Sequence, residues 1–94
     1  MPIKFDWDPS KARGNVRKHR IDFDEASTVF ADTLSITIPG PDHSEEEERW
    51  VTLGLSNRHR LLVVVHTEED GAIRLISARR ADRLERRKYE EGNS

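Results

Sequence analysis

Short runs of alternating hydrophobic and polar residues, separated by turn residues, predict five strands. The first covers residues 3–7, where Ile3, Phe5 and Trp7 alternate with charged side chains. Period-two runs follow at 34–38, 50–55 and 73–78, whereas 61–66 is apolar on both faces, as in a central strand. Turn residues separate them: Pro39-Gly40, a hairpin loop at 57–59, and a turn at 68–71 with Gly71 at positive φ.

Helical spacing predicts three helices. Asp8 and Pro9 are typical of a helix start, and a helix over 9–19 would bury Ala12 and Val16. Asp22 and Glu25 resemble a capping box that begins a second helix, with Phe23, Ala26 and Phe30 on one face and its end near Asp32. A third helix, 81–91, is basic and has only Leu84 and Tyr89 as large anchors.

The resulting order, β-α-α-β-β-β-β-α, predicts an α+β fold with an antiparallel sheet, two N-terminal helices and one basic C-terminal helix. With 94 residues, we expect a single domain over 1–94. The chain has no cysteine, which excludes disulfides and thiolate chemistry. It shows neither an apolar run of the ~20 residues of a membrane helix nor a signal-peptide pattern, so we expect a cytoplasmic protein without membrane contact.

Charge is strongly segregated along the chain although the net charge is only −2. Residues 1–21 carry +4, residues 22–48 carry −9 without any Lys or Arg, and residues 49–94 carry +3. Separate cationic and anionic patches fit a phosphate-binding protein with a distinct protein-binding face. A solvated surface with clustered charges is the alternative reading.

The sequence motifs do not indicate a metal site or a nucleotide-binding site. The four histidines (His19, His43, His59 and His66) fall in different predicted elements, and no pair has metal-ligand spacing. Neither a glycine-rich phosphate loop nor a Gly-x-Ser-x-Gly elbow occurs. We therefore expect no metal and no cofactor.

Arginines near the end of the predicted sheet point to phosphate chemistry. Metal-free RNA cleavage needs a base for the 2′-hydroxyl, an acid for the leaving oxygen, and fixed positive charge on the phosphorane. Histidine suits the first two roles and arginine the third. His66, Arg79 and Arg60 are the smallest set on adjoining strands that meets these needs, and with Glu48 they form the predicted catalytic set of four. If His66 is structural, the acid–base candidates are Glu48, Tyr89 and Lys18.

The faces of the last strand follow from simple alternation. Ile73, Leu75, Ser77 and Arg79 are expected on one face, and Arg74, Ile76, Ala78 and Arg80 on the other. Arg79 and Arg80 would then leave the sheet from opposite faces. We assign RNA binding to Lys18, Trp50, Arg80, Arg83, Arg87 and Tyr89.

Each candidate has a structural alternative. The alternative for His66 is a hydrogen-bonded core histidine, and the alternative for Arg79 and Arg80 is pairing with the acidic residues 45–48. For Trp50 it is packing in the core or on the sheet, and for residues 57–59 a turn without further role. For Lys18 and His19 it is closure of the first helix at its negative end.

The residues also resemble a known family, the BrnT toxins. The resemblance lies in Phe5-Asp6-Trp7-Asp8-Pro9-x-Lys11, Asn15-x-x-Lys18-His19, Phe23-x-Glu25-Ala26-x-x-Val29-Phe30-x-Asp32, Asp42-x-x-x-x-x-Glu48-Arg49-Trp50, residues 60–67, residues 73–81 and Glu85-Arg86-Arg87-x-Tyr89-Glu90. These motifs span nearly the whole chain in order. Arg20 and His59 stand where that family commonly has glycine.

The resemblance implies a RelE-like fold and a metal-independent ribonuclease that halts translation. It also implies a BrnA-type antitoxin partner, through whose DNA-binding domain the complex represses its own promoter. Two other classes fit the residues: a non-enzymatic module that binds RNA or ribosomes through its basic helices, and a protein-interaction subunit that uses the acidic loop or the basic tail. Strand scission separates the first class from these two.

Overall fold

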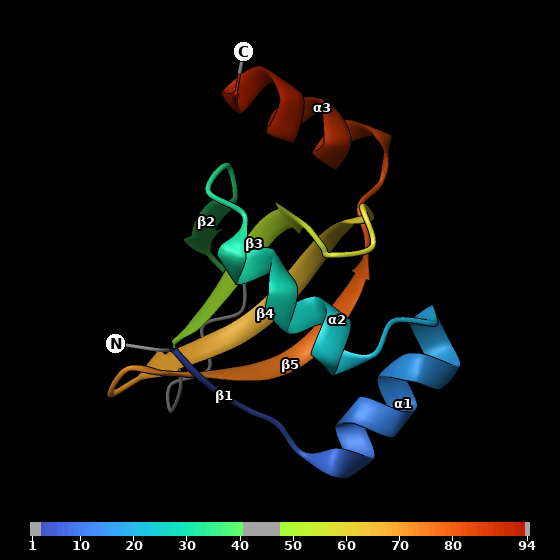
Figure 1. Cartoon of the computed structure of the whole chain (residues 1–94), viewed down its shortest axis with the longest axis vertical. Coiled ribbons are helices and arrows are strands. Elements are labelled where there is room, and N and C mark those ends of the chain that lie inside the picture. The colour runs from blue at the N-terminus through green and yellow to red at the C-terminus, as the bar shows by residue number, and fades with distance from the viewer. Residues whose placement is uncertain (1–2, 41–47, 94) are drawn as a thin grey trace.

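The computed structural model describes residues 3–40 and 48–93, and within them the chain forms one mixed sheet with helices on both faces (Figure 1). The strands are β1 (Lys4–Asp6), β2 (Ile36–Pro39), β3 (Arg49–Leu55), β4 (Leu61–Glu69) and β5 (Ala72–Arg80). The helices are α1 (Pro9–His19), α2 (Phe23–Ser27), the 3-10 turn η1 (Thr28–Ala31) and α3 (Arg83–Gly92). The predicted α+β class is confirmed.

The sheet has the order β1-β5-β4-β3-β2, so β4 is the central strand, as predicted. The expectation of a purely antiparallel sheet is wrong, because β1 pairs with β5 in parallel. Between β1 and β5 the chain makes both N-terminal helices and the three-strand meander, and this long connection allows a parallel neighbour.

Side-chain caps define where the helices begin. Asp8 accepts a hydrogen bond from the backbone N–H of Ser10, with Pro9 in the first turn of α1. Asp22 accepts from the N–H of Glu25 at the start of α2. Asp82 forms a full capping box with Glu85 at the start of α3. The predicted starts at Asp8 and Asp22 are confirmed, whereas the second helix ends earlier than expected and continues as η1.

The main core lies between α1, α2 and one face of the sheet. Its buried side chains are Ile21, Phe23, Ala26, Val29, Leu62, Val64, Ile73, Leu75 and Ala78. Val16, expected in the buried stripe of α1, is 41% exposed, and Asn15 is buried in its place. The Asn15 side chain donates to the carbonyls of Ile21 and Ala78 and accepts from the Ala78 N–H, which fastens α1 to the end of β5.

A bulge in β5 changes which residues share a face. Val65 pairs with Ser77 but His66 pairs with Leu75, so Ile76 is an extra residue. Ala78 is therefore buried in the same cluster as Ile73 and Leu75. The strict alternation expected along 73–80 is wrong from Ile76 onward, because one extra residue reverses the faces of all that follow.

Helix α3 lies at the other face of the sheet and is held mainly by polar contacts. Tyr89 packs against Leu53, Leu61 and Val63 and donates a 2.6 Å hydrogen bond to Asp32. Burial and this bond raise the pKa of Tyr89 to about 12. Leu84, expected to be the second anchor, is 66% exposed, so that expectation is wrong. Within the described residues, no helix has the length and apolar content needed to cross a membrane.

Replacing Tyr89 tests how α3 is attached. Tyr89→Phe keeps the ring but removes the bond to Asp32, which stabilises the docked helix by about 1–2 kcal/mol. We expect amide hydrogen exchange within residues 83–92 to become roughly tenfold faster. Leu84→Ala is the matched control and should leave that exchange unchanged. Equal exchange in both variants would show that Tyr89 does not hold the helix.

Candidate functional site

The four predicted catalytic residues lie at two ends of the sheet. Arg60 and Arg79 flank the start of β4 and the end of β5, whereas Glu48 and His66 lie where β3 begins. On β4, the partner of Arg80 (Leu62) precedes His66 by four residues, a separation of about 13 Å along the strand. The structure therefore does not bring the predicted set together.

His66 is completely buried on the helix-covered face. Its Nε2 lies 2.7 Å from the hydroxyl oxygen of Thr52, and its ring meets that of Phe30 edge-on at 4.8 Å between centroids. Burial lowers the pKa of His66 to about 4, so the imidazole is neutral at physiological pH. This geometry favours the structural alternative for His66, since RNA in solvent does not reach the ring.

Arg79 projects from the opposite face of the sheet. It pairs across the ladder with Val63, and Val63 belongs to the cluster beneath α3. The guanidinium binds both carboxylate oxygens of Glu85, at 2.8 and 2.7 Å. This pair holds the pKa of Glu85 down at about 2 and fastens the first turn of α3. The rival pairing with residues 45–47 lies outside the described residues.

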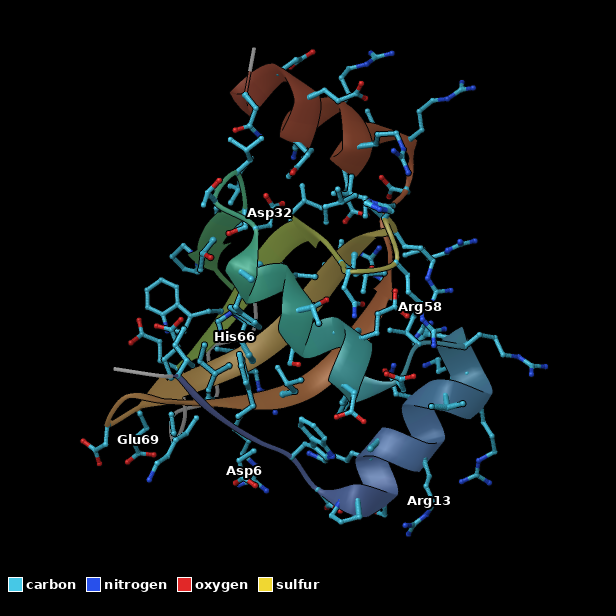
Figure 2. All side chains as sticks on the ribbon, in the orientation of Figure 1. Asp6, Arg13, Asp32, Arg58, His66 and Glu69 are labelled. Atoms are coloured by element: carbon cyan, nitrogen blue, oxygen red, sulfur yellow. The ribbon has the colours of Figure 1, made fainter. Side chains whose placement is uncertain are left out.

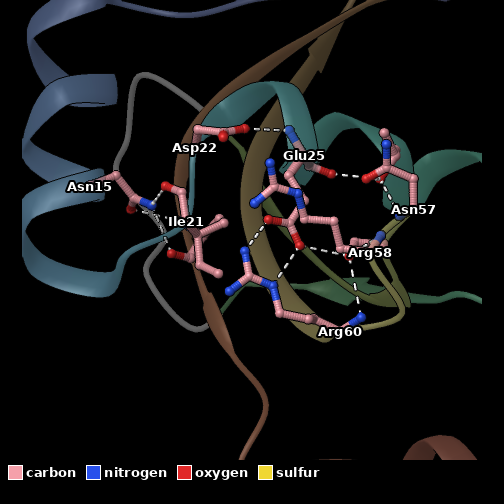
Figure 3. A network of polar contacts seen from close by, with 10 residues as sticks. Asn15, Ile21, Asp22, Glu25, Asn57, Arg58 and Arg60 are labelled. Atoms are coloured by element: carbon pink, nitrogen blue, oxygen red, sulfur yellow. Dashed lines mark hydrogen bonds and ion pairs between the residues drawn. The ribbon is translucent and has the colours of Figure 1, made fainter.

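Arg60 is held by a buried carboxylate. Its guanidinium makes a two-point ion pair with Glu25, which is 3% exposed and also accepts a 2.7 Å bond from the Ser56 hydroxyl (Figure 3). The Arg60 hydrogen bond lowers the pKa of Glu25, and Glu25 raises that of Arg60. The Ser56 hydroxyl oxygen in turn accepts from the N–H groups of Arg58 and Arg60. The network fixes the 56–60 turn against α2.

The predicted RNA-binding residues divide in the same way. Lys18, Arg80, Arg83 and Arg87 are exposed in the last turn of α1, at the end of β5 and along α3. Tyr89 is half-buried with its hydroxyl bonded to Asp32. Trp50 is half-buried and pairs with His66, and the exposed Glu48 precedes it, so both lie at the far end of the sheet.

Exposed cations lie where α1 ends, in the turn before β4, and from the end of β5 along α3. We call this surface the basic edge and define it by Lys18, Arg20, Arg58, Arg80, Arg83 and Arg87, all of which are exposed. Two charge interactions place the 56–60 turn beside the end of α1. Arg58 lowers the pKa of Glu25, and Asp22, which lies two residues after Arg20, raises the pKa of Arg60. The nearby carboxylates of Asp22 and Asp82 are engaged as helix caps.

Acidic residues gather at the other end of the sheet. Glu68 and Glu69 end β4 and Asp70 begins the turn to β5, and Asp6, Glu69 and Asp70 line one shallow pocket there. Figure 2 shows Arg58 on one side of the molecule and Asp6 and Glu69 on the other. A polyanion is thus attracted to the basic edge and repelled from the opposite end. Among the described residues, no three His, Asp or Glu side chains form a group suited to a metal ion.

Sequence reasoning did not assign RNA binding to Arg20, to Arg58 or to His59, which adjoins Arg58, although each of the three is exposed. Arg58 and His59 were interpreted as turn residues, and Arg20 was noted only as standing where the resembled family commonly has glycine. Arg20 and His59 have positive φ angles of 61° and 59°. Such angles favour glycine, so the glycine that the resembled family commonly has at these two places was the available signal.

Comparisons with known proteins agree with this architecture. The model of a family described as ribonuclease toxin, BrnT, of type II toxin-antitoxin system matches residues 7–85. The 1.1 Å crystal structure of the Brucella abortus ribonuclease toxin BrnT superposes with a TM-score of 0.63 at 22% sequence identity. That alignment covers 87% of this chain and 100% of the other, which shows a shared fold. No curated protein matches the chain.

The buried histidine gives a pH-dependent stability. The pKa of His66 is about 4 in the folded chain, against an ordinary histidine value of 6.5, so the unfolded chain takes up the proton first as pH falls. Stability is therefore complete above pH 6.5 and falls by about 2.5 kcal/mol from pH 7.5 to 4.5. The lowered pKa values of Glu25 and Glu85 reduce stability only at lower pH, as pH falls below the ordinary glutamate value of 4.5.

Urea unfolding across this pH range measures the effect. We expect His66→Gln to flatten the slope between pH 6.5 and 4.5, because no imidazole is then left to protonate. His59→Gln, at an exposed histidine, should retain the wild-type slope. A wild-type slope in the His66 variant would contradict a neutral, buried His66.

Proposed function

The chain belongs to the BrnT family of ribonuclease toxins of type II toxin–antitoxin systems, and on that premise we propose that it cleaves RNA at the basic edge without a metal ion and thereby halts translation. The observation that carries the location is the convergence of six exposed cations from three separate segments of the chain. Residues so far apart in sequence share one surface only because the fold gathers them.

Arg80 is the centre of the proposed phosphate site. It is exposed at the end of β5 and has no hydrogen bond or ion pair from its side chain to another described residue. It lies between the 56–60 turn and the first turn of α3, because its partner on β4 is Leu62. A free guanidinium at a fixed place binds a phosphate through two oxygens and stabilises the charge of the phosphorane.

The neighbouring arginines have different tasks in this proposal. Arg60 and Arg79 act as positioning residues, since their guanidinium groups are bound to Glu25 and Glu85. Arg58, Arg83 and Arg87 extend the positive surface along the RNA backbone, and Lys18 does so from α1. Much of the rate enhancement then comes from holding the 2′-hydroxyl in line with the scissile bond.

The antitoxin and the cellular setting complete the proposal. A type II toxin requires a protein antitoxin, and we propose a BrnA-type partner whose DNA-binding domain brings the complex to its own promoter. We also propose a RelE-like fold relationship and a cytoplasmic location, as the sequence resemblance implies. We expect the chain to arrest growth when it is expressed alone, and co-expression of a BrnA-type antitoxin to abolish that arrest.

Cleavage of a defined RNA in the presence of EDTA tests the activity and its place. We expect wild-type protein to cut, and Arg80→Ala to cut at least tenfold more slowly because the phosphate loses its fixed charge. Arg74→Ala is the matched control: Arg74 is also exposed on β5 but lies near the acidic turn, so its loss should leave the rate unchanged.

Two outcomes would contradict the proposal. Equal rates for folded Arg80→Ala and wild type would remove Arg80 from the site. Absence of cleavage with free RNA and again with ribosomes, together with salt-dependent binding, would favour the non-enzymatic binding module.

A further inference from the structure

Three residues other than glycine have a left-handed backbone in the described part of the chain. They are Arg20, His59 and Asp70, with φ angles of 61°, 59° and 51°. This conformation brings the Cβ atom too close to the following carbonyl oxygen, so it is unfavourable for residues with a side chain. Glycine adopts it freely. Each of these residues therefore holds strain that glycine would relieve.

The fold itself explains the left-handed backbone at each position. Arg20 ends α1, and its N–H donates to the Val16 carbonyl at 2.9 Å, an arrangement in which glycine is usual. His59 closes a three-residue hairpin loop in which Ser56 N–H donates to the Arg60 carbonyl, again a glycine position. Asp70 precedes Gly71 in a two-residue turn, where Asp-Gly is a favoured pair.

Asp70 is thus an ordinary turn residue, but the side chains of Arg20 and His59 are unexplained by the fold. Both are exposed, and neither side chain has a hydrogen bond or ion pair to another described residue. Within the described structure, backbone hydrogen bonds hold the two positions, but no side-chain contact of Arg20 or His59 compensates for the strain. Strained residues that persist without an internal reason are concentrated where a protein binds its ligand.

Their location agrees with an RNA ligand. Arg20 belongs to the basic edge, and His59 adjoins Arg58 there. His59 also lines a pocket of about 440 Å³ with Ala31, Leu55 and Asn57, and Thr28, Asp32 and Ser56 complete its wall. Ala31 and Leu55 offer an apolar surface to a planar base. The imidazole ring offers a stacking partner, and the Asn57 amide can bond to the edge of the base.

We propose that His59 and Arg20 contact RNA: His59 stacks on a nucleobase seated against Ala31 and Leu55, and Arg20 binds a backbone phosphate. This inference rests on the proposed function, because it places two further contacts in the same RNA interface. The left-handed backbone directs both side chains to the surface, and their contact with RNA is the reason why the strained conformation is retained.

Glycine substitution separates strain from binding. Arg20→Gly, His59→Gly and the control Asp70→Gly each relieve a left-handed side chain, so all three should raise Tm by about 3 °C. Binding is measured with a labelled 2′-O-methyl RNA oligonucleotide, which lacks the nucleophile for cleavage, at pH 8 and several salt concentrations. Asp70→Gly should bind as wild type does.

Arg20→Gly and His59→Gly should change RNA binding in different ways. We expect His59→Gly to weaken binding roughly tenfold with an unchanged salt dependence, since a stacked ring is lost. Arg20→Gly should lower the slope of log K against log salt by about 0.7, the value for one phosphate contact on a single strand. His59→Asn, which tolerates the left-handed backbone but has no ring, should weaken binding as His59→Gly does.

Increased stability with wild-type RNA affinity in both basic-edge variants would overturn the inference, as would the absence of any gain in Tm. The proposed function would stand in either case if wild type still cuts RNA and Arg80→Ala does not. If wild type neither binds nor cuts RNA, the inference and the proposed function fall together.

Discussion

The buried ion pair between Glu25 and Arg60 is the interaction on which the arrangement of the basic edge depends. A carboxylate that is 3% exposed is stable only if its charge is matched, and Arg60 matches it through two contacts while Ser56 supplies a third. The same network orders the N–H groups of the 56–60 turn. Asn15 adds a second clamp between α1 and β5. Together they place Arg20, Arg58, His59 and Arg80 on one rigid surface.

Much of the fold follows from local signals in the sequence. The doubly apolar run 61–66 identified the central strand, and Asp8 and Asp22 marked two helix starts because a side-chain cap is a local interaction. The parallel pairing of β1 and the burial of Asn15 instead of Val16 depend on contacts between distant segments. Local periodicity carries no information about such contacts.

The residue types of the site were easier to predict than their geometry. Arginine-rich segments correctly indicated a cationic surface, but the bulge at Ile76 and the pairing of Arg60 with Glu25, 35 residues away, decided which groups are free. His66 ends the apolar run 61–66 within β4, and its complete burial leaves the imidazole neutral and out of reach of RNA. The guanidinium of Arg80, in contrast, is exposed and forms no hydrogen bond or ion pair with another described residue. The sequence thus indicated which residue types suit phosphate chemistry, but not which of their side chains are exposed and unpaired in the fold.

The central claim is that RNA binds at the basic edge and avoids the acidic end. Backbone amide shifts of the labelled protein, titrated with a non-cleavable 2′-O-methyl RNA, test it most directly. The account predicts perturbations confined to residues 17–20, 56–60 and 79–87, with none at 68–72. Perturbations centred on 48–51 and 65–70, with the basic edge unchanged, would contradict it.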